Sequence, residues 1–342
     1  MAFSLYRRPT RKIMSEASSS TLRRSWVVWV VFVVVCLAGV GGIGAWWFGG
    51  SRGDSRDCRE LVRDGRVRDA LGDDASGMSC AEFGAAVKRA TVGAVPGEHS
   101  PEQAQAMKDV LVAVDRQIER GGGRLGPALR VPLAEALADY AADTEAILGI
   151  GTADYVRNAP PTRPAWEDAD GVHMAVPRDA LLRAVRALSE DASGYVALRM
   201  AATRHAAEGL AVVGTGATGA ELTAPTVRNA RTLGALDAVA ADVRKKEGGR
   251  WVRDVFEGLT GKASLPPAYA EEPVDHLVVS WRRSLLSRGV EESPAALEEQ
   301  SADMADVWGK AVGVDEEARG VLRGDALESA YRARGDALRR LG

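Results

Sequence analysis

The sequence predicts an all-α protein, with a single N-terminal transmembrane helix followed by an extracytoplasmic domain of about nine or ten helices. Three observations predict this class. Residues 26–48 form a run of 23 residues without a charge. Beyond it, apolar residues recur every three or four positions, which is the period of an amphipathic helix. No stretch of strand length alternates apolar and polar residues convincingly, so we expect no sheet.

The uncharged run is long enough to cross a bilayer as a helix. At ~1.5 Å per residue it rises about 35 Å, against a hydrocarbon core of ~30 Å. Backbone groups cannot remain unpaired in lipid, so a spanning segment of this kind is helical. Tryptophans lie near both ends of the run, Trp26 and Trp29 at one end and Trp46 and Trp47 at the other. This placement is expected for aromatic belts at the two membrane interfaces.

The flanking charges predict the orientation of this helix. Residues 1–25 carry six basic side chains and one acidic side chain, whereas both signs follow residue 48. Because the cationic flank stays in the cytoplasm, residues 1–25 should form a short cytoplasmic tail and residues 49–342 should lie outside. The alternative is a cleaved signal peptide, but its apolar region would span only about 7–15 residues. We therefore expect an uncleaved signal anchor in the cell membrane.

Small residues recur one helical turn apart within the run, at Ala38 and Gly42 and again at Gly41 and Ala45. Such spacing lets two membrane helices approach closely, which would support a homodimer. Glycine and alanine are also common in membrane helices that do not pair, and this second interpretation is the simpler one.

The composition of residues 49–342 limits the classes of partner. This part carries 38 basic and 46 acidic side chains. A nucleic-acid-binding domain needs a concentrated basic surface, so we expect no nucleic-acid partner. Arginine greatly outnumbers lysine, and alanine, glycine and valine are abundant, a composition typical of actinobacterial proteins with high genomic GC content.

Two of the three cysteines lie in the predicted outer part. Cys58 and Cys80 are 22 positions apart, and Cys36 belongs to the membrane run. Because the outer compartment is oxidising, we expect a disulfide between Cys58 and Cys80, with two free thiols as the alternative.

Helix-start signals in the sequence predict where the helices of the outer part begin. Ser79 with Glu82, and Ser100 with Gln103, match the capping-box pattern, in which a serine and an acidic or amide side chain pair with each other's backbone. Further helices are expected near Pro132, Pro177, Ser193, Thr223, Trp251, Leu277, Ser293 and Asp315.

Two proline-rich stretches interrupt this pattern, at residues 150–176 and 261–273. We take the second as a boundary. Residues 49–260 would form a helical domain, and residues 274–342 a C-terminal helical subdomain or a continuation of the same domain.

A glycine motif at residues 214–219 fits the G-x-G-x-x-G pattern of dinucleotide-binding sites. That site requires a preceding strand and a helix that starts at the last glycine. Here the preceding residues continue a helical pattern, and Pro225 follows soon afterwards. We therefore interpret the motif as a loop between helices and expect no cofactor.

The best local candidate for a site is the cluster Glu167, Asp168, Asp170 and His173, which lies beside Trp166 in the first proline-rich stretch. Carboxylates with a nearby imidazole can act as acid and base or bind a cation. The spacing matches neither an EF-hand loop nor the H-E-x-x-H pattern, so we predict no metal site. A solvated acidic loop is the simpler interpretation.

These observations favour a non-enzymatic role. We expect a bitopic bacterial membrane protein that presents a helical domain to a protein or cell-envelope partner. Two alternatives stay open. One is an envelope hydrolase that uses the loop 167–173, and the other is an immunity-type protein that neutralises an exported toxin.

Overall fold

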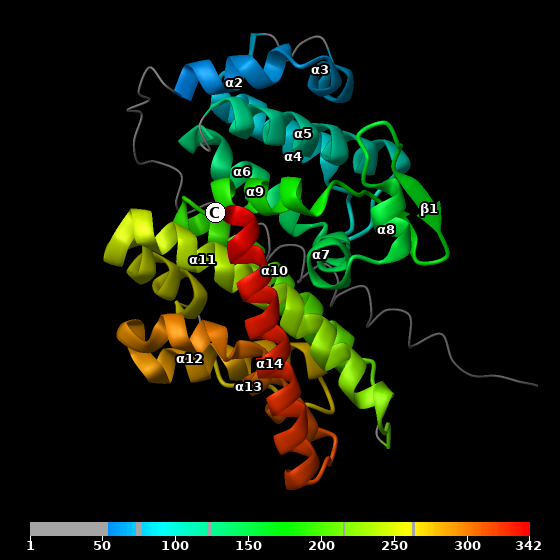
Figure 1. Ribbon diagram of the computed structural model, residues 1–342, viewed down its shortest axis with the longest axis vertical. Helices are drawn as coiled ribbons and strands as arrows, with labels where there is room; N and C mark the ends of the chain where they lie inside the picture. The colour runs from blue at the N-terminus through cyan, green and yellow to red at the C-terminus, as the bar shows by residue number, and fades with distance from the viewer. Residues whose placement is uncertain (1–53, 73–76, 122–124, 215, 262–263) are drawn as a thin grey trace, which may run out of the picture. The chain divides into compact units, whose positions relative to one another are not determined.

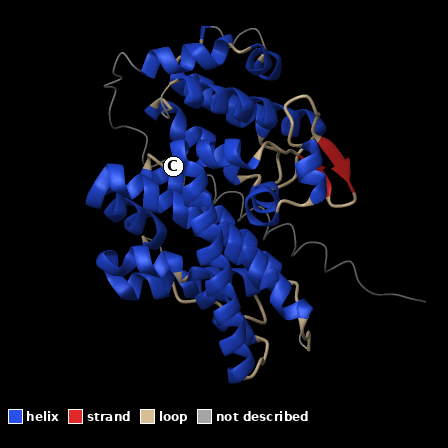
Figure 2. Cartoon of the chain, in the orientation of Figure 1, coloured by secondary structure: helices blue, strands red, loops and turns tan. Residues whose placement is uncertain are grey.

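The computed structural model describes residues 54–72, 77–121, 125–214, 216–261 and 264–342. Over these residues the chain forms thirteen α-helices, one π-helical turn and one short β-hairpin, which confirms the all-α class (Figures 1 and 2). The sequence had indicated fewer helices because three of them, α3 (Gly65–Leu71), α7 (Ala141–Glu145) and α8 (Ala153–Asn158), are too short to show a repeated helical period.

The predicted membrane helix, residues 26–48 with its four tryptophans and its small-residue pairs, lies outside the described residues. Among the helices that are described, none is both long and apolar enough to cross a bilayer. The anchor and the orientation that follows from it therefore stay predictions.

The first helices of the domain begin where their capping residues predict. Helix α4 (Cys80–Thr91) follows the capping box of Ser79, whose Oγ accepts from the backbone N–H of Glu82 at 3.3 Å. Helix α5 (Pro101–Arg120) follows that of Ser100 in the same way. Both boxes satisfy backbone N–H groups that a helix start would otherwise leave unpaired.

The predicted disulfide is present between Cys58 and Cys80. Cys58 belongs to α2 (Asp54–Arg63), and Cys80 is the first residue of α4. Their Cα atoms are 5.5 Å apart, within the usual range for a bridge. In α2, Leu61 is buried together with Cys58 in the main core cluster, so the bridge joins two helices that also pack through apolar side chains.

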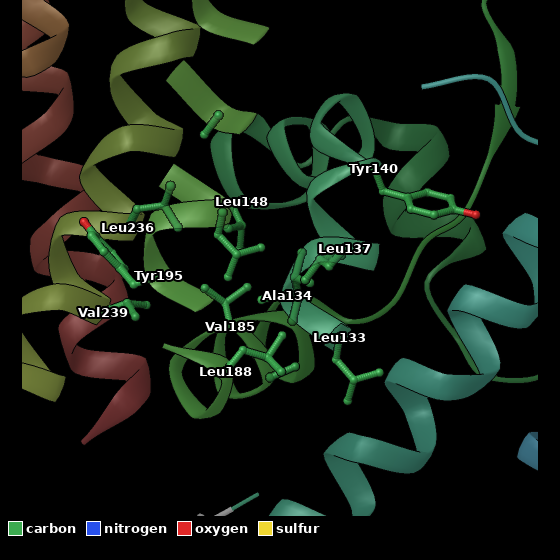
Figure 3. Packing of buried hydrophobic residues seen from close by; sticks show 14 of the residues in the cluster. Leu133, Ala134, Leu137, Tyr140, Leu148, Val185, Leu188, Tyr195, Leu236 and Val239 are labelled. Atoms are coloured by element: carbon green, nitrogen blue, oxygen red, sulfur yellow. The ribbon is translucent and has the colours of Figure 1, made fainter. Parts of the chain in front are cut away.

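The centre of the core is formed by helices α6 (Pro127–Ala138), α9 (Arg178–Leu188) and α10 (Ala192–Ala211). In Figure 3, Ala134 and Leu137 of α6 lie next to Val185 of α9, and all three belong to one buried cluster. Tyr140 lies at the edge of this group and turns its hydroxyl away from the labelled aliphatic residues.

The last four helices pack on this centre and on one another. Helix α11 (Ala220–Thr260) contacts α10, α12 (Pro273–Glu298), α13 (Gln300–Ala311) and α14 (Glu316–Leu341), and α14 runs across α11 in Figure 1. Glycines in a left-handed conformation kink two of these helices, Gly248 in α11 and Gly289 in α12. Residues 51–342 form one compact unit, which includes the helices on both sides of the predicted boundary.

Three helix starts differ from those expected. Pro132 and Thr223 lie inside α6 and α11, which begin earlier, at Pro127 and Ala220. Ser293 does not cap a helix, because the kink at Gly289 already starts the second segment of α12. Its hydroxyl donates to the carbonyl of Val290 at 2.8 Å instead of accepting from a backbone N–H.

Candidate functional site

A β-hairpin, which the sequence pattern did not predict, carries the acidic cluster. Strand β1 (Trp166–Asp168) pairs antiparallel with β2 (Gly171–His173), and each strand has only three residues, too few to show alternation. Asp168 closes the turn, since its Oδ1 accepts from the backbone N–H of Asp170 at 2.8 Å. Gly171 has a φ of 130°, which favours glycine at this position.

His173 lies between two carboxylates. Its Nδ1 is 3.1 Å from Asp143 Oδ1, and its Nε2 is 3.0 Å from Asp168 Oδ1. Asp143 belongs to α7 and is buried, whereas Asp168 lies at the exposed turn of the hairpin. The imidazole therefore fastens the hairpin to the helical domain.

The buried carboxylate of Asp143 collects further donors. Tyr155 of α8 donates its hydroxyl to Asp143 Oδ1 at 2.5 Å, and the backbone N–H of Met174 donates to Oδ2 at 3.1 Å. The ring of Tyr155 also packs edge-on against Trp166, with centroids 4.9 Å apart. Three donors satisfy a carboxylate that would be costly to bury alone.

Helix α5 holds this region in place. Lys108 of α5 is fully buried and donates from Nζ to the carbonyl of Asn158, the last residue of α8, at 2.5 Å. Burial lowers the pKa of Lys108 to about 8, and nearby Asp109 acts against this shift. Cations are favourable at the carboxyl end of a helix, so Lys108 fixes the helix that carries Tyr155.

The structure brings together two of the four predicted site residues. Asp168 and His173 contact each other, whereas Glu167 and Asp170 are exposed, and no side-chain partner is seen for either within the described part of the chain. Sequence reasoning missed Asp143 and Tyr155, which lie 30 and 18 positions from His173. No local spacing could have indicated them.

Beside this network lies a cleft of about 490 Å³. Four alanines from the end of α6, from α7 and from α10 contribute to its lining, namely Ala138, Ala141, Ala142 and Ala201. Small side chains at these positions leave the space open. Polar side chains from the loop before α5, from the end of α6, from α7, from the hairpin and from α10 complete the lining.

Three of the four histidines of the chain line this cleft: His99, His173 and His205. His99 pairs through Nε2 with Asp139 at 2.9 Å and stacks on Tyr140 with ring centroids 3.7 Å apart. His205 of α10 lies 3.2 Å from Glu145 and 3.6 Å from Glu208.

Of these two partners of His205, Glu208 lies one turn further along the same helix, whereas Glu145 comes from α7. The fourth histidine, His276, does not line the cleft, and its Nδ1 faces the carbonyl of Pro267.

Carboxylates raise the pKa of two of these histidines. The hydrogen bond to Asp143, with a second to Asp168, raises the pKa of His173 to about 9. Burial acts against protonation of His205, but the nearby carboxylates of Glu145 and Glu208 outweigh it, and the pKa of His205 also rises to about 9. Both imidazoles are therefore cationic at neutral pH.

The lining of the cleft is nevertheless acidic. Five carboxylate side chains line it, those of Glu98, Asp139, Asp143, Asp170 and Glu208. Its one arginine, Arg204, already pairs with Asp275 at 2.7 Å. Among the described residues, no group of three or more His, Cys, Asp or Glu side chains is arranged to hold a metal ion.

Comparisons with known proteins found no match to this chain, whether to a protein-family model, to a curated protein or to a solved structure. The function is therefore inferred from the residues of the cleft and from the sequence pattern.

Because these histidines pair with carboxylates, we expect the stability of the folded domain to depend on pH. A histidine whose pKa is higher in the folded than in the unfolded protein stabilises the folded state. This contribution is complete below the unfolded-state pKa of about 6.5 and is lost as pH rises through the folded-state pKa of about 9. We expect the advantage of the wild type over His173→Gln to shrink by about 1 kcal/mol from pH 6 to pH 10, a value reduced for solvent screening at the hairpin. Urea unfolding at both pH values measures it.

His276→Gln is the matched control, because His276 faces a carbonyl and no carboxylate partner is seen for it in the described structure. The difference between the wild type and this control is the baseline against which the pH-dependent change of His173→Gln is measured. A constant difference between the wild type and His173→Gln would contradict the prediction.

Proposed function

We propose that this chain is a single-pass bacterial membrane protein, anchored by residues 26–48, whose extracytoplasmic helical domain binds a protein or cell-envelope ligand in the cleft beside His173. The observation that carries the proposal is the cleft itself. Its volume of about 490 Å³ falls within the range of about 300–1,000 Å³ that is typical of ligand sites. An immunity-type protein would be one form of this binding role.

The state of His173 favours binding over hydrolysis. A general base has to accept a proton near the working pH and must reach the proton that it removes. Both ring nitrogens of His173 already contact carboxylates, and with a pKa of about 9 the ring is protonated at neutral pH. These contacts suit a fixed positioning role better than proton transfer.

Site-specific crosslinking in cells tests the proposal. A photoreactive amino acid replaces Ala142, which lines the cleft and is exposed, in full-length protein produced in its own bacterial source. We expect irradiation of intact cells to give a discrete adduct, because a bound ligand would lie within reach of this side chain. An impermeant labelling reagent applied to the same cells should modify the domain if it lies outside.

The matched control carries the photoreactive residue at Ala270, which is exposed, precedes α12 and does not line the cleft. It should give only the background pattern. The same adducts from both positions, or none above background from Ala142, would refute a ligand site in the cleft. Protection from the impermeant reagent would refute the orientation.

A further inference from the structure

We propose that the cleft recognises a cationic ligand, a basic peptide segment whose ammonium or guanidinium groups pair with the carboxylates of Glu98, Asp170 and Glu208. This inference rests on the proposed binding function and names the chemistry of its ligand. Two observations support it. These carboxylates surround one cavity, and the cations beside them already pair with other acidic side chains.

The three carboxylates come from separate elements that meet at the cleft. Glu98 lies in the loop between α4 and α5, Asp170 in the turn of the hairpin, and Glu208 on α10, and all three are exposed. No side-chain partner is seen for Glu98 or Asp170 within the described residues, and Glu208 makes only a 3.6 Å contact with His205. Each can therefore accept hydrogen bonds from a ligand.

The cations that line the cleft are held by acidic neighbours. Arg204 pairs with Asp275, His173 lies between Asp143 and Asp168, and His205 contacts Glu145 and Glu208. An anionic ligand would have to displace one of these carboxylates and would still face those without a partner. A cationic ligand needs no such exchange, and the negative potential would attract it.

The walls of the cleft argue against a carbohydrate ligand and for a flexible chain. Sugar rings are commonly bound on exposed aromatic faces, but Tyr140 is only 1% exposed and already stacks on His99. The alanines of the cleft instead give a smooth apolar surface, against which the methylene groups of lysine or arginine can lie. A basic peptide combines such stems with charged ends that reach the rim.

Titration of the full-length protein in detergent tests the proposal, with N-acetylated tri-lysine as the probe. We expect saturable binding of one peptide per chain. The triple variant Glu98→Gln/Asp170→Asn/Glu208→Gln should weaken it at least about tenfold, because it removes the three accepting charges. Ala142→Trp, which fills the cleft without changing its charge, should weaken it as well. Tri-glutamate should not bind.

The matched control is Glu247→Gln/Glu271→Gln/Glu291→Gln, which removes the same charge from exposed side chains that do not line the cleft. It should keep the wild-type affinity. Equal weakening in both triple variants, full affinity in Ala142→Trp, or no saturable binding of tri-lysine would overturn the proposal. Circular dichroism of every variant checks that the fold is retained.

Two further outcomes distinguish a wrong ligand class from a wrong proposed function. Spermidine is titrated in parallel. If it binds more tightly than tri-lysine and loses affinity in the same variants, the source of the cation is a free polyamine, and the peptide assignment falls. If adducts form from position 142 in cells while neither cation binds, the cleft is a ligand site for another chemistry.

Discussion

Replacing Arg199 by methionine should destabilise the domain by about 3–5 kcal/mol, the usual cost of leaving one partner of a buried ion pair alone. Small domains have total stabilities of roughly 5–15 kcal/mol, so the variant should lose a large part of its margin. Chemical unfolding followed by circular dichroism measures the loss. A variant within about 1 kcal/mol of the wild type would contradict the prediction.

The size of this effect follows from the surroundings of Arg199. The side chain lies on α10 with no exposed surface and donates to Asp237 Oδ1 of α11 at 2.6 Å. It also donates to Gln300 Oε1 at 2.6 Å and to the carbonyl of Leu297 at 2.8 Å. One guanidinium thus joins α10 to α11, to the end of α12 and to the start of α13.

A double variant distinguishes the stability lost with the ion pair from the stability lost with packing contacts. Burial raises the pKa of Asp237 to about 6, while Arg199 acts against that rise. Without Arg199 the carboxyl group would be buried and unpaired at neutral pH. Asp237→Leu in the Arg199→Met background should therefore recover much of the stability, because Asp237 lines a small, mainly apolar cavity beside Trp251. No recovery would show that the loss lies in packing alone.

The pH dependence of the single variant gives a second check with a definite sign. Loss of the guanidinium raises the folded-state pKa of Asp237 further above its unfolded value of ~3.9. The folded variant then binds the proton more tightly than the unfolded chain does. The destabilisation relative to the wild type should therefore be smallest in acid and should grow as pH rises above about 6, the folded-state pKa of Asp237 in the wild type. It should level off above the higher folded-state pKa of the variant.

The sequence predicted those parts of the fold that depend on local rules. The capping serines Ser79 and Ser100 start helices as expected, because a capping box is satisfied within four residues. The disulfide between Cys58 and Cys80 was predicted from the expected oxidising compartment and from the presence of two cysteines in the predicted outer part. Helix starts were wrong where proline could also be accommodated inside a helix, as at Pro132.

The candidate site was predictable only in part, for a physical reason. Asp168 and His173 are only five positions apart, so their proximity could be read from the chain, although the hairpin that pairs their strands could not. The buried partner Asp143 approaches from α7, and His205 reaches the cleft from α10, through tertiary packing alone. Dispersed histidines in a sequence therefore say little about a site until the helices that carry them are placed.

Replacing Gly234 by leucine should destabilise the domain by about 3 kcal/mol, the upper part of the range for overpacking. Gly234 lies where α11 meets α14, and a Cβ built on it would be 2.2 Å from the carbonyl oxygen of Ala330. That neighbour is backbone and cannot move aside as a flexible side chain would. The surrounding contact consists of small side chains, those of Ala230, Ala302, Ala326 and Ala330, so the two helices would have to separate.

Gly324 provides the matched control on the opposite helix. It lies inside α14, and a Cβ built there meets nothing within 4 Å. Gly324→Ala should stabilise the domain by about 0.5–1 kcal/mol, because alanine favours the helix and limits the unfolded chain. Opposite signs for the two substitutions, measured as urea midpoints, would show that close helix approach requires glycine at 234. If Gly234→Leu instead left the midpoint unchanged, α11 and α14 could not lie as closely as they do here, and the packing of the last four helices would have to be revised.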